Sequence, residues 1–192
     1  YPRDLTVADL QAADLTPLTY RVFDVKANGD VTLFDAYAAT EKRFSSDEQV
    51  SRGFSAAEWA GLEASRREAY GSSSDFTVST AADGAVTVQA VPMDWSTPGA
   101  LAGNLRQLEL LKELNPELNL GMALGGWTLS DEFSLALDDA AGREAFTSNV
   151  INTLEQYSFI TVDFDWEYPG GGGAAGNAVS VDDGANFEAT LQ

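Results

Sequence analysis

Hydrophobic positions in the second half of the chain follow two patterns that alternate. Over residues 101–117 leucines recur every three or four positions, which places them on one face of a helix. Residues 139–158 repeat this helical spacing with Phe146, Val150, Leu154 and Tyr157. The short apolar runs 118–126 and 159–167 predict buried strands, and a further helix is expected from Ala185. Helices alternating with strands indicate parallel strands with helices packed outside them, an α/β architecture.

The first half of the chain is less regular. In chain order its signals predict a short helix at 5–14, a strand at 15–25, a turn at 28–30, a helical piece at 55–70 and a hairpin formed by 76–80 and 85–91. Ser55 and Glu58 have the spacing of a capping box at the start of the helical piece. Because most of this region is polar and weakly periodic, we interpret residues 28–97 as an elaborated insertion between two core strands.

Composition restricts the chemistry that the chain can perform. The 192 residues include no Cys and no His, which excludes disulfides, thiol catalysis, the Ser-His-Asp triad and nearly all zinc chemistry. There are 30 acidic and 11 basic residues, and the net charge of −19 makes nucleic acid and anionic lipid poor partners. The charge is compatible with solubility, with adaptation to high salt or with attraction of a cationic substrate. No apolar run approaches the roughly 20 residues that span a bilayer, so no membrane partner is expected.

The stretch 158-SFITVDFDWEYPGGGG-173 carries carboxylates at every second position of an otherwise apolar run. Side chains alternate between the faces of a strand, so Asp163, Asp165 and Glu167 share one face. The other face carries apolar side chains that demand burial, namely Ile160, Val162, Phe164 and Trp166. Carboxylates about 6.5–7 Å apart in a concave site cannot all ionise cheaply, so at least one is expected to hold a proton near neutral pH. A protonated acid beside an ionised carboxylate is the pair that glycosidic cleavage requires.

Two other interpretations of these carboxylates need no catalysis. One is a solvated acidic strand face, although the apolar neighbours and the glycines at 170–173 argue against it. The other is a calcium loop that begins at Asp163. Its sixth position would be Tyr168 instead of Gly, its twelfth would be Ala174 instead of Glu, and a strand precedes it where a helix is required. We therefore expect no metal site here.

The carboxylate run resembles the active-site strand of glycoside hydrolase family 18, the chitinase family, whose motif is Asp-x-x-Asp-x-Asp-x-Glu. The stretch 122-MALGGWTLSDEF-133 resembles the second signature of the family, Ser-x-Gly-Gly, which often continues as Trp-Thr-x-Ser. The opening residues 1–20 resemble the loop and second strand of bacterial type A chitinases. The resemblance is closest over residues 101–192 and weaker over 1–25.

This resemblance implies a (β/α)8 barrel with its active site at the C-terminal ends of the strands. It implies that Glu167 is the general acid/base, that Asp165 orients the N-acetyl group of the substrate and stabilises the charged intermediate, and that Asp163 tunes Asp165. The nucleophile would be the acetamido oxygen of the substrate, with net retention and no metal or organic cofactor. Trp127 would stack on a sugar ring and Tyr168 would line the cleft, unless their roles are structural. The implied substrate is chitin or chito-oligosaccharide, and the implied location is secreted or extracellular.

The chain departs from the family motif at three positions. Ile160 replaces the first Asp of the motif, Thr161 replaces its Gly, and Ala123 replaces the Ser of the second signature. In the family that Ser and that Asp belong to one polar network. Losing one partner would leave the other buried and unpaired at a cost of roughly 1–3 kcal/mol, whereas losing both is nearly neutral. We interpret Ala123 and Ile160 as one coupled change that weakens the tuning of Asp163 and Asp165 and retains the fold.

A complete barrel of this type needs about 250 residues or more. We therefore predict that residues 1–192 are the N-terminal half of a (β/α)8 TIM barrel, covering strands two to four, and that the same longer chain or a partner supplies the rest. The preferred hypothesis is an endo-acting chitinase, a glycoside hydrolase. The alternatives are a lectin-like relative that binds aminosugars without turnover, a scaffold component, and a relative that cleaves the chitobiose core of N-glycans.

Overall fold

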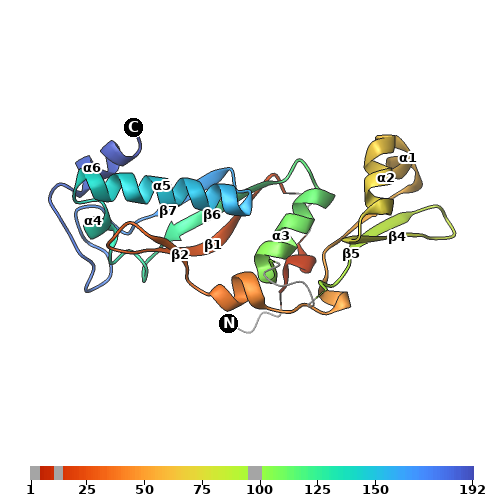
Figure 1. The fold of residues 1–192 in the computed structure, drawn as a ribbon, viewed down its shortest axis with the longest axis horizontal. Helices are drawn as coiled ribbons and strands as arrows, with labels where there is room; N and C mark the ends of the chain where they lie inside the picture. Colours follow the sequence, from red (N-terminus) through yellow and green to blue (C-terminus); the bar gives the residue numbers. More distant parts are fainter. Residues whose placement is uncertain (1–4, 11–14, 95–100) are drawn as a thin grey trace. The chain divides into compact units, whose positions relative to one another are not determined.

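The computed structural model describes residues 5–10, 15–94 and 101–192. The chain divides into two compact units, each with its own sheet and helices (Figure 1). The first unit contains Tyr1–Thr16 and Ala36–Leu118, and the second contains Pro17–Asp35 and Asn119–Gln192. Within the described ranges, no helix has the length and apolar character needed to cross a membrane.

A four-stranded sheet forms the centre of the second unit. Its strands are β1 (Pro17–Val25), β2 (Val31–Leu33), β6 (Asn119–Gly125) and β7 (Thr161–Asp165). They lie in the order β2-β1-β6-β7, in which β1, β6 and β7 are parallel and β2 returns antiparallel to β1 as a hairpin. The parallel strands predicted from the alternating hydrophobic patterns are confirmed.

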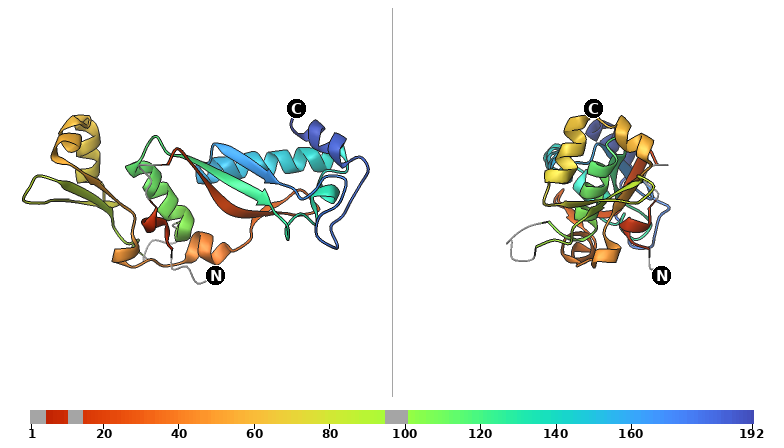
Figure 2. Two further views of the ribbon diagram at one scale, coloured as in Figure 1. Left: turned by 180° about the vertical axis from the view of Figure 1, so that it is seen from behind. Right: turned by 90° about the vertical axis from the view of Figure 1, so that its right-hand side faces the viewer.

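The helices of the second unit are α4 (Phe133–Ala136), α5 (Ala140–Tyr157) and α6 (Asp183–Thr190). Figures 1 and 2 show α5 running alongside β6 and β7. Phe146 of α5 is buried, and its ring lies 6.3 Å from that of Phe133 and 6.2 Å from that of Phe164, measured between centroids. This aromatic packing joins α4, α5 and β7 next to the C-terminal ends of β6 and β7.

The first unit combines a small antiparallel sheet with a long helix. Its elements are a 3-10 turn (Val7–Asp9), a π-helical turn (Tyr37–Glu41), a second 3-10 turn (Ser46–Glu48), β3 (Ser51–Phe54), α1 (Ala56–Gly61), α2 (Ala64–Ser72), β4 (Phe76–Thr80), β5 (Val86–Ala90) and α3 (Gly103–Leu114). The sheet order is β3-β5-β4, which confirms the predicted hairpin of β4 and β5. Helix α3 buries the leucines that its spacing predicts, Leu105, Leu108, Leu111 and Leu114.

The helical piece predicted at 55–70 is two helices. The capping box is confirmed, because the Ser55 hydroxyl accepts a hydrogen bond from the Glu58 amide at 3.2 Å. Helix α1 nevertheless stops at Gly61, and the two residues that follow have extended backbone with ψ of 147° and 138°. Glycine lowers helix propensity by about 1 kcal/mol relative to alanine, which favours the end of α1 at Gly61.

Other differences from the sequence expectations are small. The helix predicted at 5–14 is reduced to the turn at Val7–Asp9, and residues 11–14 lie outside the described residues. Strands β2 and β3 were not expected, because three or four residues are too few to show a hydrophobic period. The insertion at 28–97 and the core at 101–192 remain predictions.

Candidate active site

The carboxylates predicted to form the site lie at the C-terminal end of β7. Asp163 and Asp165 lie opposite Ala123 and Gly125 of β6 in the parallel register, so their side chains are on the same face. Glu167 follows two residues after the strand ends. Asp163 is exposed, whereas Asp165 and Glu167 are half-buried. The structure therefore gathers all three carboxylates at one edge of the sheet.

The apolar residues of this segment are only partly buried. Trp166 is buried and stacks on Phe133, with centroids 5.3 Å apart and ring planes at 13°. Val162 and Phe164 are half-buried. Ile160 is 63% exposed, so the prediction that it is buried is wrong. Because β7 is the outer strand of the sheet, a side chain near its start has strand neighbours on one side only.

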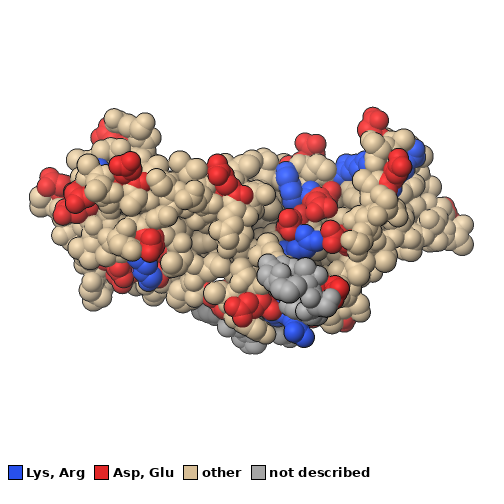
Figure 3. Space-filling view, viewed as in Figure 1, with Lys and Arg blue, Asp and Glu red and all other residues tan. Residues whose placement is uncertain are grey.

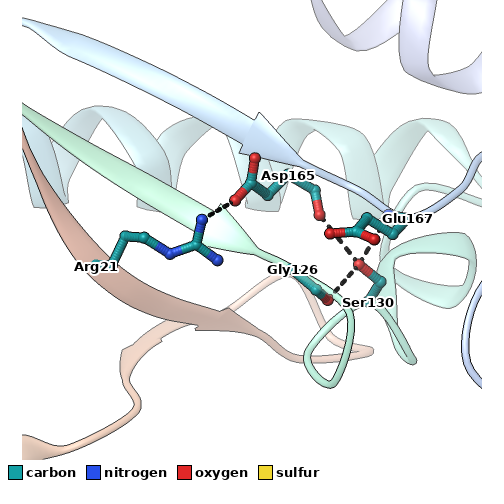
Figure 4. Close-up of polar contacts among 5 residues, drawn as sticks. All are labelled: Arg21, Gly126, Ser130, Asp165 and Glu167. Atoms are coloured by element: carbon teal, nitrogen blue, oxygen red, sulfur yellow. Dashed lines mark hydrogen bonds and ion pairs between the residues drawn. The ribbon is translucent and has the colours of Figure 1, made fainter.

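Asp165 is held through both its backbone and its side chain (Figure 4). Its carbonyl oxygen accepts hydrogen bonds from the Gly126 amide at 2.7 Å and from the Ser130 hydroxyl at 3.2 Å. Its carboxylate forms an ion pair with the guanidinium of Arg21 on β1. The Asp165 side chain is 26% exposed and that of Arg21 is 57% exposed. Sequence reasoning did not identify Arg21 as a site residue.

Ser130 links the ends of β6 and β7. Its side chain is fully buried, and its hydroxyl lies 2.9 Å from the Gly126 carbonyl oxygen and 3.2 Å from that of Asp165. The Ser130 hydroxyl oxygen also accepts a hydrogen bond from the Glu167 amide at 2.9 Å. Ser130 therefore sets the backbone position of Glu167. It occupies the last position of the Trp-Thr-x-Ser stretch, which was the one sequence signal that could have singled it out.

The Ser130→Ala variant is expected to lose about 2 kcal/mol in the free energy of unfolding, because the Glu167 amide loses its buried acceptor. Urea denaturation of this variant and of Ser148→Ala, which changes an exposed serine of α5, provides the comparison. Equal stability of the two variants would show that the Ser130 hydroxyl does not organise the strand ends. Amide exchange at Glu167 is expected to accelerate in Ser130→Ala only.

The segment after Glu167 is tied down at several points. The Glu167 carbonyl oxygen accepts a hydrogen bond from the Asn177 side chain at 3.1 Å. Gly173 packs so closely on this carbonyl that a Cβ at 173 would lie 1.8 Å from the oxygen. Further along, the buried Asp183 carboxylate accepts hydrogen bonds from the amides of Gly170 and Ser180, both at 3.0 Å. The segment that carries Glu167 is thus folded back on itself.

The Gly173→Ala variant is expected to be destabilised by about 2 kcal/mol, because its methyl group would overlap a backbone oxygen that cannot rotate away. Gly184→Ala is the matched control, since a Cβ at 184 meets no atom within 4 Å. Thermal denaturation of both variants tests the expectation. If both retain wild-type stability, the close approach of Gly173 to Glu167 is not a constraint.

Two aromatic side chains named from the sequence are exposed beside the carboxylates. Trp127 follows the glycines that end β6 and is 53% exposed, and Tyr168 follows Glu167 and is 51% exposed. The glycine turn before Trp127 has a φ of +98° at Gly126, which favours a residue without a side chain. Acidic side chains outnumber basic ones on the visible face of the second unit (Figure 3). Exposed rings next to carboxylates suit a polar ligand with flat apolar faces.

A separate charged group lies at the C-terminal end of β1. Asp24 is buried, and its carboxylate pairs with the Lys26 ammonium. This hydrogen bond to Asp24 is the main reason that the pKa of Lys26 is raised, and the negative charge of Glu132 adds to it. Glu132 also accepts a hydrogen bond from the Ala27 amide at 2.5 Å. Lys26 is therefore committed to Asp24 and does not serve the carboxylates on β7.

The carboxylates in the described part of the chain do not form a metal site. No group of three or more His, Cys, Asp or Glu side chains converges to hold a metal ion there. A cavity of about 580 Å³ lies in the first unit, where Lys42, Asp75, Arg106 and Glu109 line it together with apolar residues. None of the three site carboxylates lines this cavity.

Comparison with known proteins identifies relatives of the chain. Chitinase A1 of Niallia circulans is 42% identical over 97 residues, which are 50% of this chain and 14% of that protein. Chitinase 1 of Aphanocladium album is 27% identical over 180 residues, which are 93% of this chain and 32% of that protein. The chain thus spans at most 32% of the length of these two relatives.

A solved chitinase structure and a family sequence model also match the chain. The catalytic domain of the psychrophilic chitinase B from Arthrobacter TAD20 matches 100% of this chain and 43% of its own, with a TM-score of 0.70 and 24% identity. At that identity the likeness shows the fold alone. The sequence model described as Glycosyl hydrolases family 18 matches residues 3–192, nearly the whole sequence. This chain belongs to family 18 of the glycosyl hydrolases.

Proposed function

We propose that the chain is the N-terminal half of a barrel that hydrolyses chitin at internal bonds. The observation that carries this proposal is the position of Asp163, Asp165 and Glu167 at the C-terminal end of β7, beside the end of its parallel neighbour β6. In barrels of alternating strands and helices, catalytic groups lie at that end of the strands. The parallel strands β1, β6 and β7 would be strands two to four. The remaining strands would come from the same longer chain or from a partner.

Glu167 acts as general acid and then as general base in the proposed reaction. It protonates the glycosidic oxygen while the acetamido oxygen of the substrate attacks C1, which breaks the bond to the leaving sugar. Glu167 then takes a proton from the water that opens the cyclic intermediate, and the configuration at C1 is retained. Support comes from its half-buried side chain and from the backbone contacts with Ser130 and Asn177 that fix its position.

Asp165 orients the acetamido group and stabilises the positive charge of the cyclic intermediate, and Asp163 tunes Asp165. The exposed rings of Trp127 and Tyr168 contact the sugar. The proposed substrate is β-1,4-linked N-acetylglucosamine polymer or its oligosaccharides. The reaction requires neither a metal nor an organic cofactor. Chitin is a polymer outside the cell, so the proposed location is extracellular.

The test is to incubate the native protein that contains this chain with N-acetylchitohexaose. Dimers, trimers and tetramers are expected together from the first minutes, and the new reducing ends should initially be β-anomers in a proton NMR spectrum. Release of dimers alone would contradict internal cleavage. Tight binding without products would point to a lectin-like relative, and a stable protein partner with neither binding nor products would point to a scaffold.

A further inference from the structure

Arg21 occupies an irregular position in β1. The parallel pairing with β6 shifts between Tyr20 and Phe23, which lie opposite Met122 and Leu124, so β1 contains one extra residue there. A bulge of this kind redirects the side chains at the irregularity. The guanidinium of Arg21 reaches across β6 to the Asp165 carboxylate on β7 (Figure 4). The glycine at 126 leaves room for it, because a Cβ there would lie 2.7 Å from Nη2 of Arg21.

The exposure of this ion pair indicates a role other than stability. With side chains 57% and 26% exposed, the pair resembles surface salt bridges, which contribute little to folding. The ion pair has more effect on the direction of the Asp165 carboxylate than on folding. The Asp165 backbone is already fixed, because its carbonyl oxygen accepts hydrogen bonds from Gly126 and Ser130. A residue with a fixed backbone has its carboxylate direction set by whichever group pairs with the side chain. In the described structure that group is Arg21.

No other basic side chain of the second unit is available to pair with Asp165. The side chains of Ala123 and Ile160 have no hydrogen-bonding group. The second unit has two further basic residues, and both are committed elsewhere. Lys26 pairs with Asp24, and Arg143 donates to the Leu137 carbonyl oxygen at 2.9 Å and to the Asn186 side chain at 3.1 Å.

We propose that Arg21 is the positioning residue of Asp165, which holds this carboxylate in the direction needed to receive the acetamido group of the substrate. The inference rests on the proposed function for its catalytic consequence, whereas the pairing itself rests on the geometry. Arg21 acts through Asp165 and does not touch the reacting atoms. Its loss should therefore affect turnover more than substrate binding.

A double-mutant cycle in the native protein tests this inference. Arg21→Met, which keeps the apolar stem, and Arg21→Lys, which keeps the charge, are each made in the wild-type and Asp165→Asn backgrounds. Arg21→Met is expected to lower kcat on N-acetylchitohexaose about tenfold with less than about a threefold change in KM, and Arg21→Lys to recover part of the loss. In the Asp165→Asn background, Arg21→Met should change kcat by less than about twofold. Arg143→Met should leave kcat within about twofold of wild type.

The outcomes separate this inference from the proposed function. A role through Asp165 would be overturned if Arg21→Met lowered kcat by the same factor in the wild-type and Asp165→Asn backgrounds. An unchanged kcat in Arg21→Met would also overturn it. A native protein without turnover would overturn the proposed function instead. The carbon-13 NMR signal of the Asp165 carboxylate decides the pairing without turnover, because a bound guanidinium changes its chemical shift. A shift of this signal in Arg21→Met that is absent in Arg143→Met supports the pairing, and an unchanged signal in Arg21→Met overturns it.

Discussion

The Glu167→Gln variant is expected to hydrolyse chito-oligosaccharides at least about 1,000-fold more slowly than the wild type and to bind them within about threefold of wild-type affinity. General acid–base catalysis contributes about 10²–10⁴-fold, and in the proposed mechanism one residue serves both the protonation and the deprotonation step. Glutamine has nearly the same size but cannot transfer the proton. The hydrogen bonds that hold this residue involve its backbone groups, so the variant keeps its position in the site.

Initial rates and calorimetric binding on the native protein measure the two quantities. Glu188→Gln is the matched control, because Glu188 is exposed on α6 and loses the same charge. A loss of less than about tenfold in Glu167→Gln would show that another group supplies the proton. Loss of binding in this variant would mean that Glu167 holds the ground-state substrate, which the proposed roles do not include.

The elements around the site could be predicted because each shows its own hydrophobic period. Strand β6 is apolar and closes in glycines, and α5 carries Phe146 and Val150 at helical spacing, so both are recognisable without knowledge of their partners. Alternation along β7 also placed Asp163 and Asp165 on one face. Ile160 is the exception, since alternation predicts which face a side chain shares and not whether another element covers that face.

The residues that fix the site could not be predicted in the same way, because their partners are distant in the sequence. Arg21 and Asp165 are 144 positions apart, and their contact depends on a bulge that leaves no periodic signal. Ser130 lies 37 positions from Glu167. The sequence predicts a helix from Ala185, but it does not show that the carboxylate of Asp183 is buried against Ser134, 49 positions earlier. A single sequence gives the residue types of such contacts and not their pairing.

The Asp183→Ala variant is expected to lose about 4 kcal/mol in the free energy of unfolding. Asp183 is 1% exposed, and its carboxylate accepts hydrogen bonds from the Ser134 hydroxyl at 2.6 Å and from the amides of Gly170 and Ser180 at 3.0 Å. Hydrogen bonds to a charged group contribute about 1.5–3 kcal/mol each. The sum is reduced because Gly170 is exposed and its amide can return to water.

Asp182→Ala is the control for this variant, since Asp182 is exposed and makes no side-chain cap of α6. Urea denaturation of the native protein should separate the two variants by several kcal/mol, and amide exchange at Gly170 and Ser180 should accelerate in Asp183→Ala alone. Asp183 connects the segment that follows Glu167 to Ser134 of α4. Because this connection helps to hold Glu167 in place, hydrolysis should also slow in Asp183→Ala. Equal stability of the two alanine variants would show that the buried carboxylate does not hold this segment, and the position of Glu167 would then depend on Ser130 and Asn177 alone.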